Sequence, residues 1–189
     1  VPILVDPACA CVKDVAPDAV VDAVLAKRNL GTSMDMAPIV VGVGPGFTAG
    51  VDCHAVVETM RGHTLGRAYY EGSALPNTAV PGLVGGFAGE RVLRAPCDGG
   101  FRGVATIGDH VEEGQVVAYA GNAPVVATLT GVLRGLIADG VQVHQGLKCG
   151  DVDPRGQSGY CGLVSDKGLA VAGGVLEAIL HLSGTFSAR

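Results

Sequence analysis

Short apolar runs separated by Gly- and Pro-containing breaks dominate the first seventy residues, and they predict alternating strands and helices. The run at 39–43 is continuously apolar, which is typical of a strand buried in a parallel sheet. Residues 19–26 follow a Pro-Asp break and are rich in valine, so we interpret them as a strand rather than a helix. The runs at 2–5 and 68–71 predict further strands, and residues 9–16 predict a short helix.

A longer helix is predicted over residues 51–61, because apolar residues recur there at helical spacing. On this interpretation the opposite face of the helix is polar, with its side chains at spacings of four and three. The apolar face carries Cys53, Val56, Val57 and Met60, and the polar face carries His54, Glu58 and Arg61.

The segment 165–182 predicts a C-terminal helix that begins at Ser165 or Asp166, both of which are suitable N-cap residues. The pair Gly173-Gly174 weakens the middle of this helix by about 1 kcal/mol per glycine. Such a pair predicts either a break or a close approach to another backbone. We expect this helix to pack back on the N-terminal layer.

Between these parts the chain contains an internal repeat. Positions 95–114 align with 127–146, and both copies have the pattern A-x-x-x-G, then R-G, then G-x-x-V-x-x-G. Short strands and glycine turns in two copies predict two interlocked β-halves. The predicted organisation is an α/β domain over 1–75 that is joined by a C-terminal helix within 163–189, a Gly/Pro-rich linker over 76–90, and a duplicated β domain over 91–155.

The duplicated pattern resembles the barrel-sandwich hybrid of biotinyl and lipoyl carrier domains. In those domains the hairpin between the two halves carries a modified lysine. The corresponding stretch here is AYAGNAPVVA, with Gly121-Asn122 at the predicted turn, and it has no lysine. Lys148, near the end of the repeat, is the only lysine in this region, so neither biotin nor lipoyl attachment is expected.

Composition excludes several classes of function. The 189 residues are 48% hydrophobic and carry a net charge of −5 without a basic stripe, so neither nucleic acid nor a membrane is expected as a partner. No apolar run reaches the roughly 18 residues of a membrane span. No signal peptide is recognised at the start of the chain. The six scattered cysteines have no metal-ligand spacing; they predict reduced, mostly buried thiols, a cytoplasmic protein and no metal site.

The most distinctive stretch is GVGPGFTAGVD, which joins the predicted strand at 39–43 to the predicted helix at 51–61. It matches neither the dinucleotide fingerprint nor the Walker A loop. Two interpretations remain open: a tight structural turn, or a loop that wraps an anionic group at a helix N-terminus. The candidate ligand-binding residues are Gly42, Gly44, Pro45, Gly46, Phe47, Thr48, Asp52 and Arg61.

The polar side chains that follow this loop also allow two interpretations. They are either a solvated set of charges on a helix surface or acid/base groups beside the anion. The candidate catalytic residues are His54, Glu58 and His63.

Several blocks together resemble the accessory proteins of selenium-dependent molybdenum hydroxylases. The most specific are GVGPGFTAGVD and ETMRGH, and others are PDAVVDAVLAKRNLGT, EGSALPNT, GDVDPRG and SDKGLAVAGGVLEAIL. The alternating strands and helices of the first part predict a parallel, Rossmann-like layer. The resemblance implies a role in maturation of these hydroxylases, with a molybdopterin-type cofactor or a nucleotide as the expected ligand. It also implies that the family's N-terminal Rossmann-like segment is missing ahead of Val1.

Three functions are therefore kept open. The first is a maturation factor that binds a phosphate-bearing ligand at the loop Gly42–Asp52 and works with a molybdenum hydroxylase or its cofactor machinery. The second is an enzyme that acts on a small anionic substrate through His54, Glu58 and His63. The third is a non-catalytic adaptor that docks onto a hydroxylase. Association into a homo-oligomer is left open as well.

Overall fold

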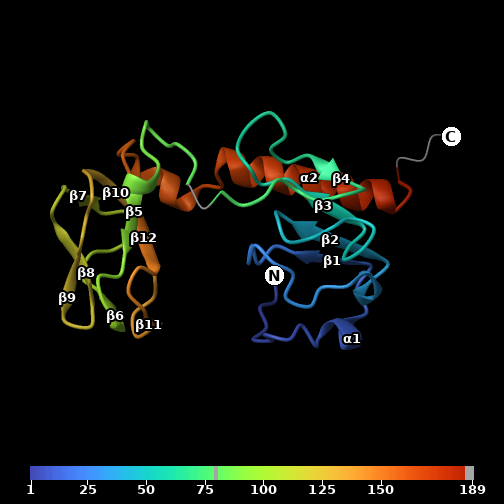
Figure 1. The fold of residues 1–189 in the computed structure, drawn as a ribbon, viewed down its shortest axis with the longest axis horizontal. Coiled ribbons are helices and arrows are strands. Elements are labelled where there is room, and N and C mark those ends of the chain that lie inside the picture. Colours follow the sequence, from blue (N-terminus) through green and yellow to red (C-terminus); the bar gives the residue numbers. More distant parts are fainter. Residues whose placement is uncertain (79–80, 186–189) are drawn as a thin grey trace. The chain divides into compact units, whose positions relative to one another are not determined.

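The computed structural model describes residues 1–78 and 81–185, and the chain divides into two compact units (Figure 1). One unit combines Val1–Thr78 with the C-terminal segment that starts at Ser165, and the other lies between them in the sequence. Within the described residues the fold is mixed α/β, with three four-stranded sheets and one long C-terminal helix. Residues 79 and 80, inside the predicted linker, lie outside the described residues.

The first unit is built on a sheet with the order β1-β2-β3-β4, in which β4 is antiparallel and the other three strands are parallel. The strands predicted at 19–26, 39–43 and 68–71 are confirmed in shorter or equal form, whereas the strand predicted at 2–5 is wrong. The elements of the first unit are α1 (Val12–Val15), β1 (Ala19–Asp22), η1 (Met34–Met36), β2 (Ile39–Val43), β3 (Ala55–Val57), β4 (Ala68–Tyr69) and α2 (Asp166–Leu182).

Helix α2 covers one face of this sheet, as predicted. The Ser165 hydroxyl accepts a hydrogen bond from the Gly168 N–H at 3.1 Å and caps the helix N-terminus. The apolar face of α2 packs on side chains of β2 and β3, and this cluster is buried around Ala178. Gly174 is the point of closest approach, because a Cβ there would collide with the backbone oxygen of Gly66. The predicted close approach to another backbone is therefore confirmed, and the helix is unbroken.

The opposite face of the sheet is covered by irregular chain, and the helix predicted at 51–61 is wrong. Residues 44–54 form the crossover from β2 to β3, and 55–57 are strand β3 itself. Gly44 and Gly46 have φ of +85° and +111°, values outside the right-handed helical region. The chain instead folds back so that Phe47 packs on this face in a cluster with Val40, Ala49, Cys53, Val56 and Ala74.

In the second unit, the internal repeat of the sequence is also a repeat of strands. Each strand of the first copy returns as a strand of the second, so that β6, β7 and β8 start at positions equivalent to the starts of β10, β11 and β12. Its elements are η2 (Gly89–Arg91), β5 (Val92–Arg94), β6 (Gly99–Gly103), β7 (His110–Val111), β8 (Val116–Ala120), β9 (Ala123–Val126), β10 (Gly131–Leu136), β11 (Gln142–Val143), β12 (Lys148–Asp153) and η3 (Ser158–Gly162).

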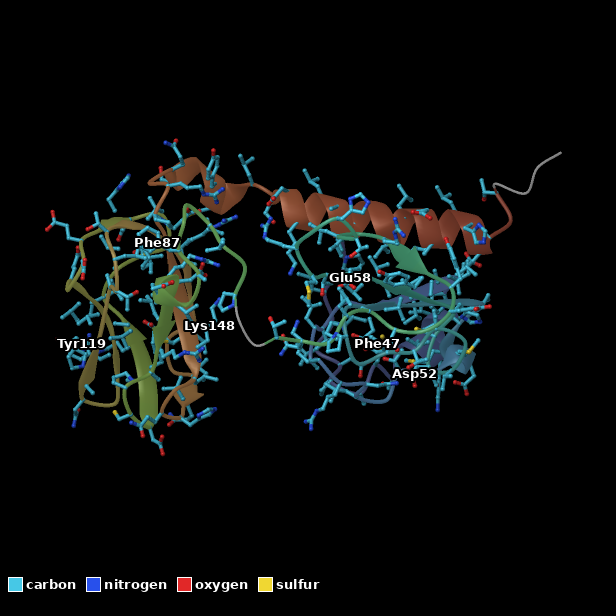
Figure 2. All side chains as sticks on the ribbon, turned by 45° about the horizontal axis from the view of Figure 1, so that its top comes forward. Phe47, Asp52, Glu58, Phe87, Tyr119 and Lys148 are labelled. Atoms are coloured by element: carbon cyan, nitrogen blue, oxygen red, sulfur yellow. The ribbon has the colours of Figure 1, made fainter. Side chains whose placement is uncertain are left out.

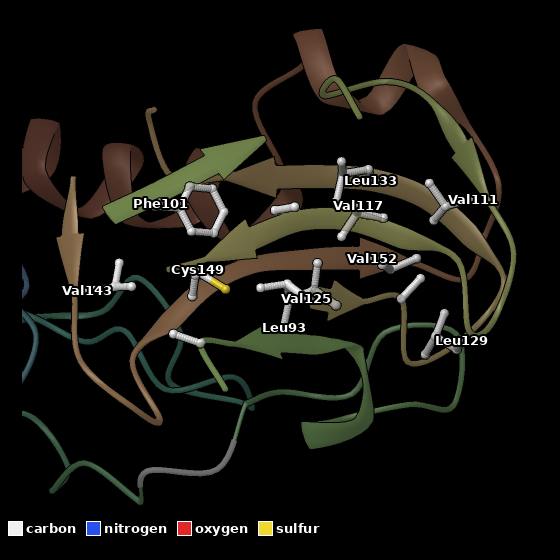
Figure 3. Close-up of a cluster of buried hydrophobic side chains, with 14 residues drawn as sticks. Leu93, Phe101, Val111, Val117, Val125, Leu129, Leu133, Val143, Cys149 and Val152 are labelled. Atoms are coloured by element: carbon white, nitrogen blue, oxygen red, sulfur yellow. The ribbon is translucent and has the colours of Figure 1, made fainter. Parts of the chain in front are cut away.

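The two sheets of this unit are exchanged by the repeat. One has the order β5-β12-β10-β7 and the other β11-β6-β8-β9. Strands β5, β6, β7 and β8 correspond to β9, β10, β11 and β12. When each strand is replaced by its counterpart, the order of the first sheet becomes that of the second sheet, read from its other edge. Phe101 and Leu133 are such counterparts, and both lie in one core cluster of 14 buried residues between the sheets (Figure 3). Neither copy therefore buries its apolar side chains alone.

The predicted hairpin turn is confirmed. Ala120 pairs with Ala123, which leaves Gly121-Asn122 as a two-residue turn between β8 and β9. Gly121 has a φ of +54°, as primed hairpin turns require.

The two adjacent glycines of α2 provide a matched test of its packing. We expect Gly174→Ala to destabilise the protein by more than about 2 kcal/mol, because the new methyl group collides with backbone. Gly173→Ala should stabilise it by about 1 kcal/mol, because no atom lies within 4 Å of the new Cβ and alanine favours the helix. Urea unfolding of both variants measures these changes. Equal effects would contradict the proposed packing of α2 on the loop at Gly66.

A second prediction concerns Asp153, which is 1% exposed at the end of β12. It accepts hydrogen bonds from Arg155 at 2.9 and 2.6 Å and from Arg134 at 3.2 Å. These bonds, above all those from Arg155, lower the pKa of Asp153, so its carboxylate stabilises the fold at neutral pH and loses this contribution as pH falls through that lowered pKa. We expect Asp153→Asn to cost about 2 kcal/mol at pH 7. Unfolding curves measured from pH 7 to pH 3 should show the difference from the parent shrinking below about pH 4.

Candidate functional site

The parallel strands β1, β2 and β3 end at the same edge of their sheet, and the loops that follow them pack together there. A Cβ at Gly46 would lie 2.6 Å from the backbone N and Cα of Arg28, in the loop after β1. A Cβ at Gly44 would lie 2.9 Å from the Thr59 hydroxyl, in the loop after β3. Glycine is therefore required at both positions for the three loops to meet. In open α/β sheets this carboxyl edge is where ligands bind.

Three positively charged side chains converge at this edge, and we call Lys27, Arg61 and Lys167 the cationic cluster. Lys27 follows β1, Arg61 follows β3 and Lys167 is in the first turn of α2. Burial lowers the pKa of Lys167, and the positive charges of Lys27 and Arg61 lower it further. The nearby Glu58 carboxylate opposes this change. The arrangement is thus one in which an anion would relieve repulsion among the cations.

The Arg61 guanidinium also forms a two-pronged ion pair with Asp166, at 2.6 and 2.9 Å. Both side chains are solvent-accessible, at 36% and 72% exposed. The Asp166 carboxylate thus lies beside the cationic cluster, where the planar guanidinium fork suits an oxyanion.

Glu58 is fully buried at the end of β3 and acts as an anchor for the loops around this edge. Its Oε1 accepts hydrogen bonds from the N–H groups of Thr59 and Met60, both at 2.7 Å, and its Oε2 accepts one from Leu75 at 2.8 Å. These three bonds satisfy the carboxylate and tie the segment after β4 to the end of β3.

Asp52 and His54 lie at the other end of the strands. Asp52 Oδ2 accepts a hydrogen bond from the Thr48 N–H at 2.8 Å, and His54 Nδ1 accepts one from the Val40 N–H at 3.0 Å. Four extended residues, about 13 Å, separate His54 from Glu58 along the chain. Figure 2 accordingly shows Glu58 and Asp52 on different sides of Phe47. The predicted polar helix face of His54, Glu58 and Arg61 therefore does not form.

The other candidate residues from the sequence also lie in different places. Gly44, Pro45 and Gly46 are at the carboxyl edge with Arg61, and His63 lies in the exposed turn that follows β3. Gly42 and Phe47 pack against each other, since a Cβ on Gly42 would lie 2.6 Å from the Phe47 ring.

Sequence reasoning missed Lys27 and Lys167. Lys27 follows a predicted strand, which is a usable signal. Lys167 belongs to the C-terminal helix, on the far side of the second unit in the sequence, and only the fold brings it to the same edge.

In the described part of the chain no group of three or more His, Cys, Asp or Glu side chains is placed to hold a metal ion. No helix there is long and apolar enough to cross a membrane.

All six cysteines are free, and only Cys53 and Cys149 are buried, so the prediction of mostly buried thiols is wrong.

Comparison with known proteins finds a relative in Escherichia coli (strain K12), the uncharacterized protein YqeB, which is 52% identical over 182 residues. The match covers 96% of this chain and 34% of the relative, so the chain spans about a third of the length of that curated protein. No family model matches the chain, and no solved structure matches it.

The anchoring role of Glu58 can be tested by removing its charge. We expect Glu58→Gln to destabilise the protein by about 2 kcal/mol, because an amide group cannot accept all three backbone N–H bonds. The exposed Glu71 supplies the control, since Glu71→Gln should change stability by less than about 0.5 kcal/mol. Chemical denaturation measures both. Equal stabilities for the two variants would show that the carboxylate does not hold these loops.

Proposed function

We propose that this chain binds a phosphate-bearing group at the cationic cluster and serves, in the cytoplasm, as an accessory maturation factor for selenium-dependent molybdenum hydroxylases. The observation that carries the binding proposal is the meeting of the loops after β1 and β3 with the first turn of α2. It places Arg61 on Asp166, next to Lys167, and brings the Lys27 charge close enough to act on Lys167. The pathway is supported by the blocks GVGPGFTAGVD and ETMRGH, which resemble that family. The ligand we favour is a molybdopterin-type cofactor or a nucleotide.

The chemistry of the edge favours a phosphate over a neutral ligand. The charged form of Lys167, which Lys27 and Arg61 disfavour, is stabilised by a group with two or more negative charges. Arg61 can hold two oxygens of such a group, as it already holds the two carboxylate oxygens of Asp166.

At the finer level of fold, we propose that the first unit is a Rossmann-like layer and that the second is a barrel-sandwich hybrid. The exchange of two four-stranded sheets by the internal repeat supports the second assignment. The turn Gly121-Asn122 has no lysine to carry biotin or lipoate, which favours a docking role for this unit over a carrier role.

The enzyme alternative receives less support. It needs His54, Glu58 and His63 around one substrate, whereas His54 and Glu58 lie at opposite ends of β3 and Glu58 is engaged by three backbone groups. We therefore favour binding without catalysis.

The proposed site predicts opposite effects on ligand binding for two adjacent residues. We expect Lys167→Gln to weaken the binding of inorganic pyrophosphate about tenfold, which is about 1.4 kcal/mol. The same variant should be at least as stable as the parent without ligand, because it removes a half-buried charge repelled by Lys27 and Arg61. Asp166→Asn should strengthen binding, because it removes a carboxylate that competes for Arg61.

Thermal shift and calorimetric titration with pyrophosphate, ATP and molybdopterin measure these effects by mass action. Arg94→Gln in the second unit is the control for a nonspecific loss of positive charge. The site is wrong if Lys167→Gln binds pyrophosphate as the parent does, if Arg94→Gln weakens binding as much as Lys167→Gln, or if Asp166→Asn and Lys167→Gln weaken it equally.

A further inference from the structure

The outer faces of the two sheets in the second unit differ, although the repeat relates the sheets themselves. Val92 and Val132 are 6% and 0% exposed and do not belong to the core cluster, whereas their neighbours Leu93 and Leu133 do. Because side chains alternate along a strand, both valines lie on the outer face of the sheet β5-β12-β10-β7. Their counterparts in the other sheet are Pro124 and Gly100, and both of these are exposed.

Chain connectivity explains the difference. The segments that lead into β5 and away from β12 pack on their own sheet, with η2 against β12 and η3 against β10. Gly85 of the first segment approaches Pro154 of the second, where a Cβ would lie 2.9 Å from the proline ring. In the other sheet the equivalent strands, β9 and β8, are joined directly by the turn Gly121-Asn122. So short a turn leaves no chain to fold over that sheet.

We call the uncovered surface the open face; it is formed by Gly100, Arg102, Tyr119, Pro124 and Val126. The Arg102 guanidinium lies 4.7 Å above the Tyr119 ring (labelled in Figure 2). Pro124 is the register partner of Tyr119, and Val126 is 41% exposed. Tyrosine and arginine side chains of this kind are enriched in protein interfaces.

The repeat also shows which charge the open face lacks. Arg134, the counterpart of Arg102, pairs with the Asp153 carboxylate at 3.2 Å. The residue that corresponds to Asp153 is Gly121, and the residue that corresponds to Asp151 is Tyr119. Among the described residues no carboxylate forms an ion pair with Arg102, so the face is left with an uncompensated positive charge above an aromatic ring.

We propose that the open face docks an extended acidic segment of a partner protein. A carboxylate of that segment pairs with Arg102 as Asp153 pairs with Arg134, and its backbone covers Tyr119 and Pro124 as the chain's own segments cover Val92 and Val132. The inference does not depend on the cationic cluster of the first unit.

The experiment is an NMR titration of the ¹⁵N-labelled chain with two synthetic decapeptides, one alternating Glu and Val and one alternating Lys and Val. The acidic peptide should shift the amide signals of β6, β8 and β9, and the basic peptide should not. Arg102→Gln should weaken the acidic peptide at least fivefold. Arg94→Gln removes an exposed cation from the other sheet and should leave the affinity unchanged.

Three results would overturn the proposal. The first is a shift map that centres on Arg94 and Lys148, which would assign acidic segments to the covered sheet instead. The second is equal binding of the basic peptide or no binding of either one. The third is a dimer, measured by light scattering, that Arg102→Gln dissociates, because a second copy would then be the occupant of the open face.

Discussion

The architecture of the first unit depends on the parallel pairing of β2 between β1 and β3. All five residues of β2 are buried, so both faces of the strand must be covered by other parts of the chain. Helix α2 supplies one cover, after the interruption from Ala79 to Val164 that forms the other unit. The crossover 44–54 supplies the other cover without a helix, and Phe47 fills the space where a helix would usually pack. Parallel pairing also places the ends of three strands, and the loops that follow them, at one edge.

Where irregular chain covers a strand, the buried backbone N–H and C=O groups of that chain need hydrogen-bond partners. A helix pairs these groups within itself, but a loop does not. At the carboxyl edge, the buried Glu58 carboxylate accepts the N–H groups of Thr59 and Met60, which follow β3, and of Leu75, which follows β4. Gly44 and Gly46 meet the matching steric requirement, because larger residues would separate the loops. Folding alone therefore explains why Gly44, Gly46 and Glu58 are present. Any ligand bound there uses an edge that folding has already assembled.

What could be predicted from the sequence was local. The strand at 39–43, the turn Gly121-Asn122, the Ser165 cap and the internal repeat each have a signal within a few residues or at a fixed spacing. The apolar spacing at 51–61 predicts a helix, but it also fits a turn followed by a short buried strand, so pairing with β2 decided the outcome. The cationic cluster needed the fold, because Lys27 and Lys167 lie on either side of the whole second unit in the sequence.

Both units show how a connection, rather than a strand, determines which surface remains available. In the repeat, eight strands obey the same internal relation, yet one sheet is covered and the other is open. A tight turn joins β8 to β9, whereas longer segments lead into β5 and away from β12 and pack on their own sheet. In the first unit, loops of unequal length leave the same strand edge and carry its charges. The length of a connection therefore decides which strand side chains stay open to a ligand or partner. Arg102 and Arg134 illustrate this point, since they are equivalent in the repeat, yet Arg134 pairs with the Asp153 carboxylate and Arg102 lies over the Tyr119 ring.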